Sequence, residues 1–391
     1  MDWRTFKTKF EKRLNLQDPN YLEIIFATAL AHRIHGDPPW LFWVAQSGGG
    51  KTEVLRTFRD VDDIKYIESM TTKTLVSHFG TGRGGKKEMA DFSLIPKLKD
   101  KCLIIKDFTN ILSLRFETRE EIFSQLRCAY DGEYDTATGL GEKSYKVKFG
   151  ILAGVTPAIE KRKSLRGTLG ERFLMVKTIF EDKDLRQAKV RDAIKNAIIK
   201  PKIREELKEL TTEMMDSVPI KHEDMDFKFN VSRDQHEWFA RMAELLARMR
   251  GTIPRNGYGK HEIIDEPDIE LGTRIADQIM HLFVALRLLV DKDDALRATA
   301  RVVKDSIPSI RAKMAEYAYK RGKLTMADYP SAIAYGTLQR HADDLVALGV
   351  FSREGDGEGY IYRLEKDLVD DVAGLFGGEK ELRKQRPGMW E

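Results

Sequence analysis

Cysteine is scarce in this sequence, and long apolar runs are missing. The 391 residues include two cysteines, Cys102 and Cys128, without metal-ligand spacing between them. Such sparse use of cysteine is typical of the reducing cytosol, and we expect both thiols to be buried. No apolar run approaches the ~20 residues that span a bilayer. The charged start MDWRTFKTKFEKR lacks the apolar core of a secretory signal. We therefore expect a cytoplasmic protein without membrane contact.

A strong excess of one charge is also absent. The sequence has 66 Lys and Arg against 62 Asp and Glu, a formal net charge of +4. This balance neither demands nor excludes a nucleic-acid partner, so the distribution of charge must decide. The hydrophobic share of 42% is enough for buried cores, and the length indicates two or three domains.

Strand and helix patterns alternate over the first half of the chain. Two amphipathic helices are expected within residues 1–36. Apolar segments typical of buried strands follow at residues 41–45, 64–69, 102–107 and 149–157. Helices are expected from Lys51, at 118–130, and in a helix-rich stretch between the second and third strands. Strands separated by helices predict an α/β fold with a parallel sheet covered on both faces.

A glycine-rich turn directly follows the first expected strand. Its residues are Ala45, Gln46, Ser47, Gly48, Gly49, Gly50, Lys51 and Thr52. This is the P-loop pattern with Ala in place of the first Gly. The glycines let backbone N–H groups point at a phosphate, Lys51 reaches the β- and γ-phosphates, and Thr52 offers its hydroxyl to Mg²⁺. The pattern predicts ATP and Mg²⁺ binding; an ordinary glycine-rich turn ending in Lys-Thr is the alternative.

An acidic residue is expected on a neighbouring strand, and the segment CLIIKD ends at Asp107. We expect Asp107 to hold the Mg²⁺ shell or to activate the attacking water. The position beside it, Lys106 or Phe108, is not acidic in either case. Three acids on the next helix could be recruited if the fold brings them back: Glu117, Glu120 and Glu121. The water-activating group therefore stays open.

The motifs that follow resemble those of AAA+ ATPases, most closely the minichromosome-maintenance (MCM) branch and its relatives in phages and mobile elements. The strand FGILAGVTP ends at Thr156, and GERF places Arg172 one segment later. By this resemblance Thr156 is the first sensor and Arg172 an arginine finger that serves the neighbouring subunit's nucleotide. Arg274, in a Thr-Arg context, maps to the second sensor. The alternatives are surface arginines at both positions. The resemblance spans about residues 20–290.

Two basic segments also resemble pore loops of that branch. EYDTATGLGEKSYKVKFGIL alternates around Gly139-Leu140-Gly141 and predicts a β-hairpin, with Lys143 and Lys146 as DNA contacts. The glycine-rich loop 80–87 carries Arg83 and Lys86. It formally satisfies GxGxxG, but it does not follow a strand, so we reject a dinucleotide site. Both segments could instead be ordinary solvated loops.

The C-terminal part predicts a winged helix that contacts DNA. Residues 334–348 fit a recognition helix, and 351–364 alternate around Asp356-Gly357 as a wing. Four residues fall on the exposed front of that helix, where a helix-turn-helix reads the major groove: Tyr335, Thr337, Arg340 and His341. Acidic residues on the same surface leave open a protein-docking winged helix.

The expected architecture is a P-loop AAA+ sheet with a helical lid and a C-terminal winged helix. The domains are expected at 1–36 (N-terminal helices), 37–181 (ATPase core), 182–294 (lid), 295–366 (winged helix) and 367–391 (polar tail). The predicted function is an ATPase that works as a homo-hexamer or other ring, a replicative DNA helicase in its sharpest form. An ATP-gated initiator or helicase loader and a signalling NTPase remain the alternatives.

Overall fold

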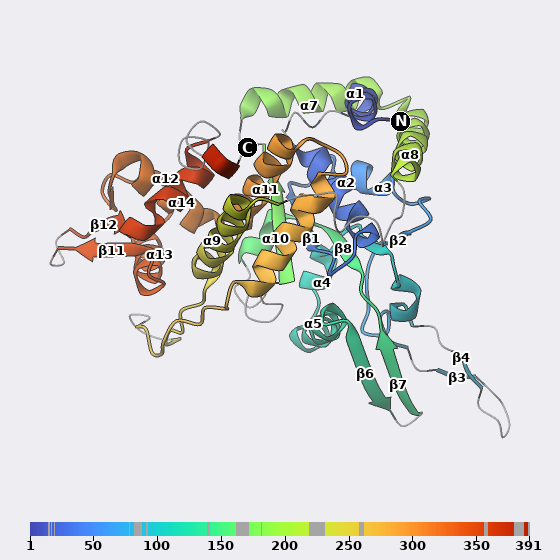
Figure 1. The fold of residues 1–391 in the computed structure, drawn as a ribbon, viewed down its shortest axis with the longest axis horizontal. Helices are drawn as coiled ribbons and strands as arrows, with labels where there is room; N and C mark the ends of the chain where they lie inside the picture. The colour runs from blue at the N-terminus through green and yellow to red at the C-terminus, as the bar shows by residue number, and fades with distance from the viewer. Residues whose placement is uncertain are drawn as a thin grey trace. The chain divides into compact units, whose positions relative to one another are not determined.

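The computed structural model describes residues 1–14, 16, 18, 20–77, 79–81, 88–90, 93–138, 141–161, 172–180, 182–218, 231–257, 262–355, 359–378 and 387–389. The chain divides into two compact units, whose residues can be followed with the colour bar of Figure 1. Unit 1 comprises residues 1–229 with 281–291, and unit 2 comprises 230–280 with 292–391. The expected lid, 182–294, is thus shared between the units rather than forming one body.

Unit 1 is built on a five-stranded sheet in which neighbouring strands pair in parallel. The strands are β1 (Trp40–Ala45), β2 (Ile64–Ile67), β5 (Cys102–Ile105), β8 (Gly150–Val155) and β9 (Phe173–Thr178). Their order across the sheet is β2-β5-β8-β1-β9. Every residue of β1, β5 and β8 is buried, which explains their unbroken apolar runs. The predicted α/β fold with a parallel sheet is confirmed; β9 was not singled out from the sequence.

Helices cover both faces of this sheet. Helix α2 (Tyr21–Leu30) packs against β8, β1 and β9, and its Tyr21 ring stacks on Trp43. Helix α5 (Phe116–Tyr130) supplies apolar side chains to a core cluster with Trp40 and Phe42, the alternate residues of β1. All residues of α2 are buried, so the expectation of an amphipathic helix there is wrong. The helix is enclosed on all sides because α1 (Trp3–Arg13) covers it with an aromatic cluster.

Two hairpins extend from the same end of unit 1 in Figure 1. One pairs β6 (Glu133–Thr138) with β7 (Gly141–Lys146), which confirms the predicted hairpin. The other pairs β3 (Phe79–Thr81) with β4 (Glu88–Ala90). The helix-rich stretch expected between β2 and β5 is therefore wrong, since this hairpin and a short 3₁₀ turn at Ile95–Leu98 occupy it.

The remaining helices of unit 1 surround the turn after β1. They are α3 (Lys51–Arg56), α4 (Thr109–Leu112), α7 (Lys183–Asn196) and α8 (Lys200–Ser217). The C-terminal end of α8 is fixed from the sheet side, where Arg33 Nη1 donates to the carbonyl oxygens of Met215 and Val218. The same guanidinium pairs with Asp63 at 2.5 Å, so three segments meet at one buried cation.

Unit 2 consists of helices followed by a small antiparallel sheet, as the sequence predicts. Its helices are α9 (Arg233–Arg250), α10 (Thr273–Leu286, whose last turns belong to unit 1), α11 (Lys292–Ser306), α12 (Ser309–Arg321), α13 (Tyr335–Ala347) and α14 (Val369–Phe376). The strands β10 (Leu324–Thr325), β12 (Ile361–Leu364) and β11 (Phe351–Glu354) form the sheet in that order. The expectation of a polar tail after 366 is wrong for α14, whose Val372 and Phe376 are buried, and for buried Met389.

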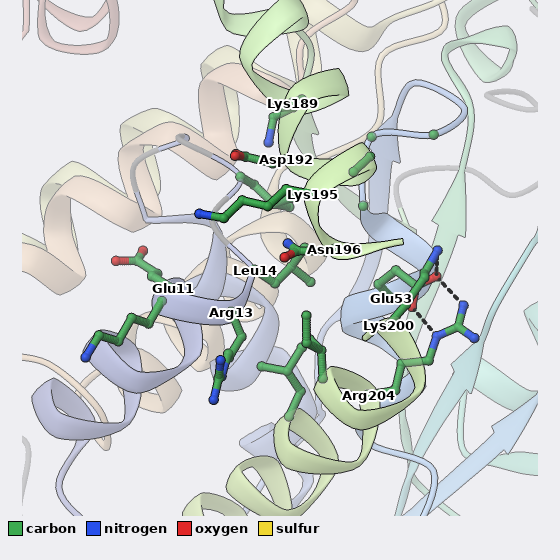
Figure 2. A pocket seen from close by; sticks show the side chains of 18 residues that line it. Glu11, Arg13, Leu14, Glu53, Lys189, Asp192, Lys195, Asn196, Lys200 and Arg204 are labelled. Atoms are coloured by element: carbon green, nitrogen blue, oxygen red, sulfur yellow. Dashed lines mark hydrogen bonds and ion pairs between the residues drawn. The ribbon is translucent and has the colours of Figure 1, made fainter. Parts of the chain in front are cut away.

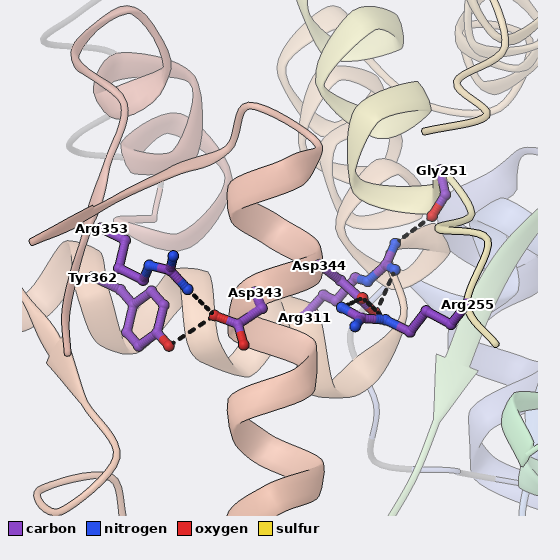
Figure 3. A network of polar contacts seen from close by, with 7 residues as sticks. All are labelled: Gly251, Arg255, Arg311, Asp343, Asp344, Arg353 and Tyr362. Atoms are coloured by element: carbon purple, nitrogen blue, oxygen red, sulfur yellow. Dashed lines mark hydrogen bonds and ion pairs between the residues drawn. The ribbon is translucent and has the colours of Figure 1, made fainter. Parts of the chain in front are cut away.

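Two adjacent carboxylates on α13 hold unit 2 together (Figure 3). Asp344 accepts hydrogen bonds from Arg255 at 2.7 Å and from Arg311 at 3.4 Å. Arg311 also donates to the carbonyl oxygens of Met249 and Gly251. The neighbouring Asp343 accepts from Arg353 and from the Tyr362 hydroxyl, which ties α13 to the β11–β12 hairpin. The helix is therefore oriented by charge on both sides.

Among the described residues, no helix combines the length and apolarity needed to cross a bilayer. Cys102 is buried in β5, but Cys128 is exposed on α5, so the expectation of two buried thiols is wrong for Cys128. Its position in α5 points away from the face that packs on the sheet.

Candidate nucleotide-binding site

The turn between β1 and α3 has the backbone geometry of an anion-binding loop. Gly48 and Gly50 have φ of 77° and 92°, in the left-handed region that favours glycine. A β-carbon at Gly49 would lie 3.0 Å from the carbonyl oxygen of Gln46, whose bond from Gly49 N closes the turn. Successive N–H groups in such a turn form a concave site for a phosphate at the start of a helix.

Lys51 crosses from α3 to the neighbouring strand. Its side chain is buried, and Nζ donates to the carbonyl oxygen of Val155 at 2.7 Å. Burial lowers the pKa of Lys51 to about 8, while the charge of Asp107 opposes this shift. The ammonium group is thus largely protonated at neutral pH and held by a carbonyl oxygen that a phosphate oxygen can replace.

The strand behind Lys51 leaves room for its stem at Gly154. A β-carbon at position 154 would lie 2.6 Å from the carbonyl oxygen of Lys106 and 3.0 Å from Cδ of Lys51. The Gly154 carbonyl accepts from Phe108 N at 2.8 Å, which links β8 to the segment after β5. Gly154 is therefore a site residue that sequence reasoning missed; an isolated glycine inside a strand was the available signal.

Asp107 and Thr156 follow β5 and β8 at the carboxyl edge of the sheet, where ligands bind in parallel α/β folds. Asp107 Oδ1 accepts from Thr109 N at 3.0 Å, and Thr109 Oγ1 accepts from Thr156 N at 3.0 Å. Thr109 thus joins the two predicted residues, although no sequence motif singles it out. The structure brings together Lys51, Asp107 and Thr156.

The neighbours of Asp107 do not supply a second acid. Phe108 is buried in the core, and Lys106 pairs with Glu68 at 3.2 Å. Of the three acids on α5, Glu117 and Glu121 are exposed, and Glu120 lies 3.9 Å from Nε of Arg119. Among the described residues, none of these three side chains forms a hydrogen bond or ion pair with Asp107, so the group that activates water stays a prediction.

A cavity of about 300 Å³ opens beside the turn, between α1, α7 and α8 (Figure 2). Apolar side chains line part of its wall: Leu14, Leu16, Ile203 and Leu207. Six cationic side chains also line it, against the three carboxylates of Glu11, Glu53 and Asp192: Lys12, Arg13, Lys189, Lys195, Lys200 and Arg204. The excess of positive charge suits a polyphosphate, and the apolar wall suits a flat base.

Glu53, the residue after Thr52, ties α8 to this site. Its carboxylate accepts two hydrogen bonds from Arg204, both 2.7 Å, and lies 3.2 Å from Lys200 Nζ (Figure 2). These hydrogen bonds, led by those from Arg204, lower the pKa of Glu53 to about 2. The contact joins residues 151 positions apart, which no local pattern could have revealed.

Arg172 lies at the amino-terminal end of the parallel strands, whereas the turn lies at their carboxy-terminal end. It precedes β9, which pairs with β1 from Trp40↔Phe173 to Ala45↔Thr178. The six residues of β9, at about 3.3 Å each, separate the two ends of the strand by roughly 17–20 Å. The guanidinium lies 5.6 Å from the centre of the Tyr130 ring and 3.7 Å from Asp131. The structure therefore does not bring Arg172 to the turn of its own chain.

The predicted DNA contacts are described in part. Lys146 is exposed on β7 and pairs with Glu133 at 3.0 Å, which raises the pKa of Lys146. Arg83, Lys86 and the side chain of Lys143 lie outside the described residues. On α13, Tyr335 is exposed, while Thr337, Arg340 and His341 are half-buried.

Arg274, the expected second sensor, forms an ion pair with Glu270 four residues earlier. Both belong to unit 2, and the assignment of Arg274 stays a prediction. The described cations that line the cavity beside the turn belong to α1, α7 and α8. Comparison with protein-family models and with curated proteins of known function gives no match to this chain.

Proposed function

We propose that this protein is an AAA+-type ATPase that acts on DNA as an oligomeric ring. The observation that carries the proposal is the convergence of three groups at the carboxy-terminal ends of the parallel strands. The glycine turn with Lys51 follows β1, and Asp107 and Thr156 follow two other strands at the same edge. The sheet order, with β8 between the strands that carry the turn and the acid, supports the AAA+ assignment.

In this proposal the triphosphate lies in the turn, and Lys51 exchanges the Val155 carbonyl for phosphate oxygens. The Lys51 charge survives burial because its pKa stays near 8. The hydroxyl of Thr52 and the carboxylate of Asp107 suit a Mg²⁺ ion that keeps water and phosphate ligands. Bound there, the ion would neutralise charge on the phosphates. Thr156, held by Thr109, positions a polar group near the terminal phosphate.

The location of Arg172 supports a role in a neighbouring subunit. It is separated from its own turn by the length of β9, so it cannot serve that nucleotide. A ring of head-to-tail copies would place the amino-terminal end of β9, with Arg172, against the nucleotide site of the next subunit. There a guanidinium can stabilise the charge that develops on the phosphoryl oxygens. The side chain would first have to turn away from Tyr130 and Asp131.

DNA as the partner is supported by the hairpins and by unit 2. The β6–β7 hairpin carries exposed Lys146, and the order α12, α13 and hairpin resembles a winged helix. Arg353 of that hairpin pairs with Asp343 and stacks on Tyr360 at 4.5 Å. This pairing reduces the positive charge available for DNA. The protein-docking alternative is therefore kept as an outcome of the test.

A second candidate, an ATP-gated loader or initiator, is favoured by one observation. Neither Lys106 nor Phe108 is acidic, and Asp107 is bonded to the Thr109 backbone. A site with a single carboxylate at this edge would bind nucleotide well and hydrolyse it slowly. A signalling NTPase would also join a P-loop core to a small helical module, but would not bind DNA.

The test measures ATP hydrolysis and DNA binding by the full chain, with and without single-stranded DNA. Strong stimulation supports the motor, slow unstimulated hydrolysis with DNA binding supports the loader, and absent DNA binding supports the signalling switch. Arg172→Ala mixed with Lys51→Ala tests the trans role, because mixed rings contain sites with both Lys51 and Arg172. Recovery of hydrolysis on mixing is expected; no recovery would remove Arg172 from the mechanism.

A further inference from the structure

Helix α7 presents an apolar and basic outer face. None of its 14 residues, all within the described part of the chain, is buried. Val190 and Ile194 are 60% and 72% exposed, and Ile198 in the turn that follows is 94% exposed. The spacing of four residues aligns Val190 and Ile194 on one side of the helix. A shallow hollow on the same side is lined by Lys183, Arg186 and Arg191 together with Val190.

This face is distinct from the side of α7 that lines the nucleotide cavity. The cavity is lined by Lys189, Asp192, Ala193, Lys195 and Asn196. With 3.6 residues per turn, all of these except Ala193 lie about 100° or more around the helix from Val190 and Ile194, and Ala193 borders the stripe. One side of α7 therefore belongs to the candidate site, and the other carries an apolar stripe that unit 1 does not cover. Contiguous exposed apolar surface of this kind marks an interaction site.

A complementary patch lies at the start of α5. Phe116 is 61% exposed and Leu114 is 36% exposed. Glu117 and Glu121 are exposed on the same helix, one turn apart. The buried Arg119 places its guanidinium over the Phe116 ring at 5.5 Å and fixes that ring in place. Arg115 is exposed beside them, so the patch is apolar with a net acidic margin.

We propose that the outer face of α7 docks on the start of α5 in a second copy of this chain. The apolar stripe would cover Phe116 and Leu114, and Arg186 and Arg191 would face Glu117 and Glu121. In Figure 1 the two helices lie toward opposite ends of unit 1, so one copy cannot satisfy both faces. Two different patches in contact make a heterologous interface, which closes into a ring or continues as a filament.

The inference deepens the proposed assembly and does not depend on the nucleotide chemistry. An anionic membrane is the competing occupant, because an apolar helix face flanked by cations also binds lipid surfaces. The second copy is favoured because it accounts for the apolar and acidic patch on α5 as well as for the stripe. A membrane would leave Phe116 and its acidic neighbours unexplained.

The experiment measures self-association of the full chain by sedimentation velocity, with Ile194→Asp as the main variant. We expect Ile194→Asp to raise the dissociation constant at least about tenfold, because a charge would enter the centre of the contact. Ile264→Asp is the matched control, since Ile264 is 64% exposed outside the proposed surface, and it should change nothing. Circular dichroism on each variant verifies that the helices are retained.

Charge exchange identifies the partner patch. Arg186→Glu with Arg191→Glu should weaken association, and adding Glu117→Lys with Glu121→Lys should restore it. A monomeric wild type, or association that Ile194→Asp leaves intact, would overturn the proposal. So would a failure of the combined charge exchange to restore association. Sedimentation of monomers with phosphatidylserine vesicles, lost in Ile194→Asp, would assign the stripe to membranes instead.

Binding of fluorescent ATP to the same preparations separates this proposal from the proposed function. Retained nucleotide binding with a monomeric wild type would leave the nucleotide site standing and remove the α7 contact. Association that depends on α7 in a protein that does not bind nucleotide would support the α7 contact and remove the nucleotide site.

Discussion

Gly154→Ala tests the packing behind the phosphate-binding turn with one added methyl group. The new carbon would lie 2.6 Å from the Lys106 carbonyl oxygen and 3.0 Å from the Lys51 stem. The carbonyl belongs to the backbone of the strand region beside β8 and has little freedom to move. The strain must therefore displace Lys51, shift β8, or both. Overpacking of this kind costs about 1–3 kcal/mol.

The expected result is a fall in melting temperature of about 2–12 °C, using 2–4 °C per kcal/mol for a domain of this size. Affinity for ATP should fall as well, because the moved Lys51 loses its position beside Val155. Gly150→Ala on the same strand is the matched control. Its β-carbon would meet Pro38 at 3.4 Å, an ordinary contact, so stability and affinity should stay near the wild-type values.

Differential scanning calorimetry and ATP titration on both variants provide the measurement. Calorimetry is preferred because the two units can unfold in separate transitions. A Gly154→Ala protein that melts within a degree of Gly150→Ala and binds ATP equally well would show that this packing argument is mistaken.

Two further predictions concern charge. The pKa of Glu53 is lowered to about 2 from 4.5, so its ion pairs with α8 stabilise the fold above pH 4.5, and the contribution is lost as the pH falls toward 2. Glu53→Gln should lower the free energy of unfolding by about 1–2 kcal/mol at pH 7, after allowance for solvent screening. In urea unfolding, the difference in stability between wild type and variant should become smaller at pH 3. A difference that does not change with pH would contradict a stabilising role of these ion pairs. Asp344→Asn should cost about 3–5 kcal/mol, because the buried Arg311 and the half-buried Arg255 would lose their counter-charge. Asp343 pairs with an exposed arginine, so Asp343→Asn should lower the free energy of unfolding by less than about 1 kcal/mol. Equal losses of stability for Asp343→Asn and Asp344→Asn in urea unfolding would refute this difference between the two carboxylates.

Much of unit 1 could be predicted because its signals are local. Parallel strands buried on both faces need continuous apolar runs, and β1, β5 and β8 have them. The β6–β7 hairpin was visible as alternation around two glycines. By contrast, β9 carries Lys177 within an apolar segment and has residues that are only partly buried, so its place beside β1 could not be read from the sequence.

The parts that were missed depend on contacts between distant segments. Helix α2 is buried all round only because α1 covers the side that faces away from the sheet. The cavity beside the turn needs α7 and α8, and Glu53 meets Arg204 across 151 residues. Helix α14 was hidden in a polar tail because its charged Asp371 is satisfied by Arg241 of the distant α9. Such pairings follow from tertiary structure and leave no periodic trace in the sequence.

The central claim is that the glycine turn and Lys51 hold a triphosphate, and ATP titration of Lys51→Met tests it most directly. Methionine keeps the apolar stem beside Gly154 but removes the charge. The account predicts binding weakened by about 10–100-fold, in line with loss of one or two charge-assisted hydrogen bonds. It also predicts that wild-type affinity falls as the pH rises through about 8, the pKa of Lys51, and that Lys51→Met lacks this step. Equal affinities and matching pH profiles for the two proteins would contradict the claim.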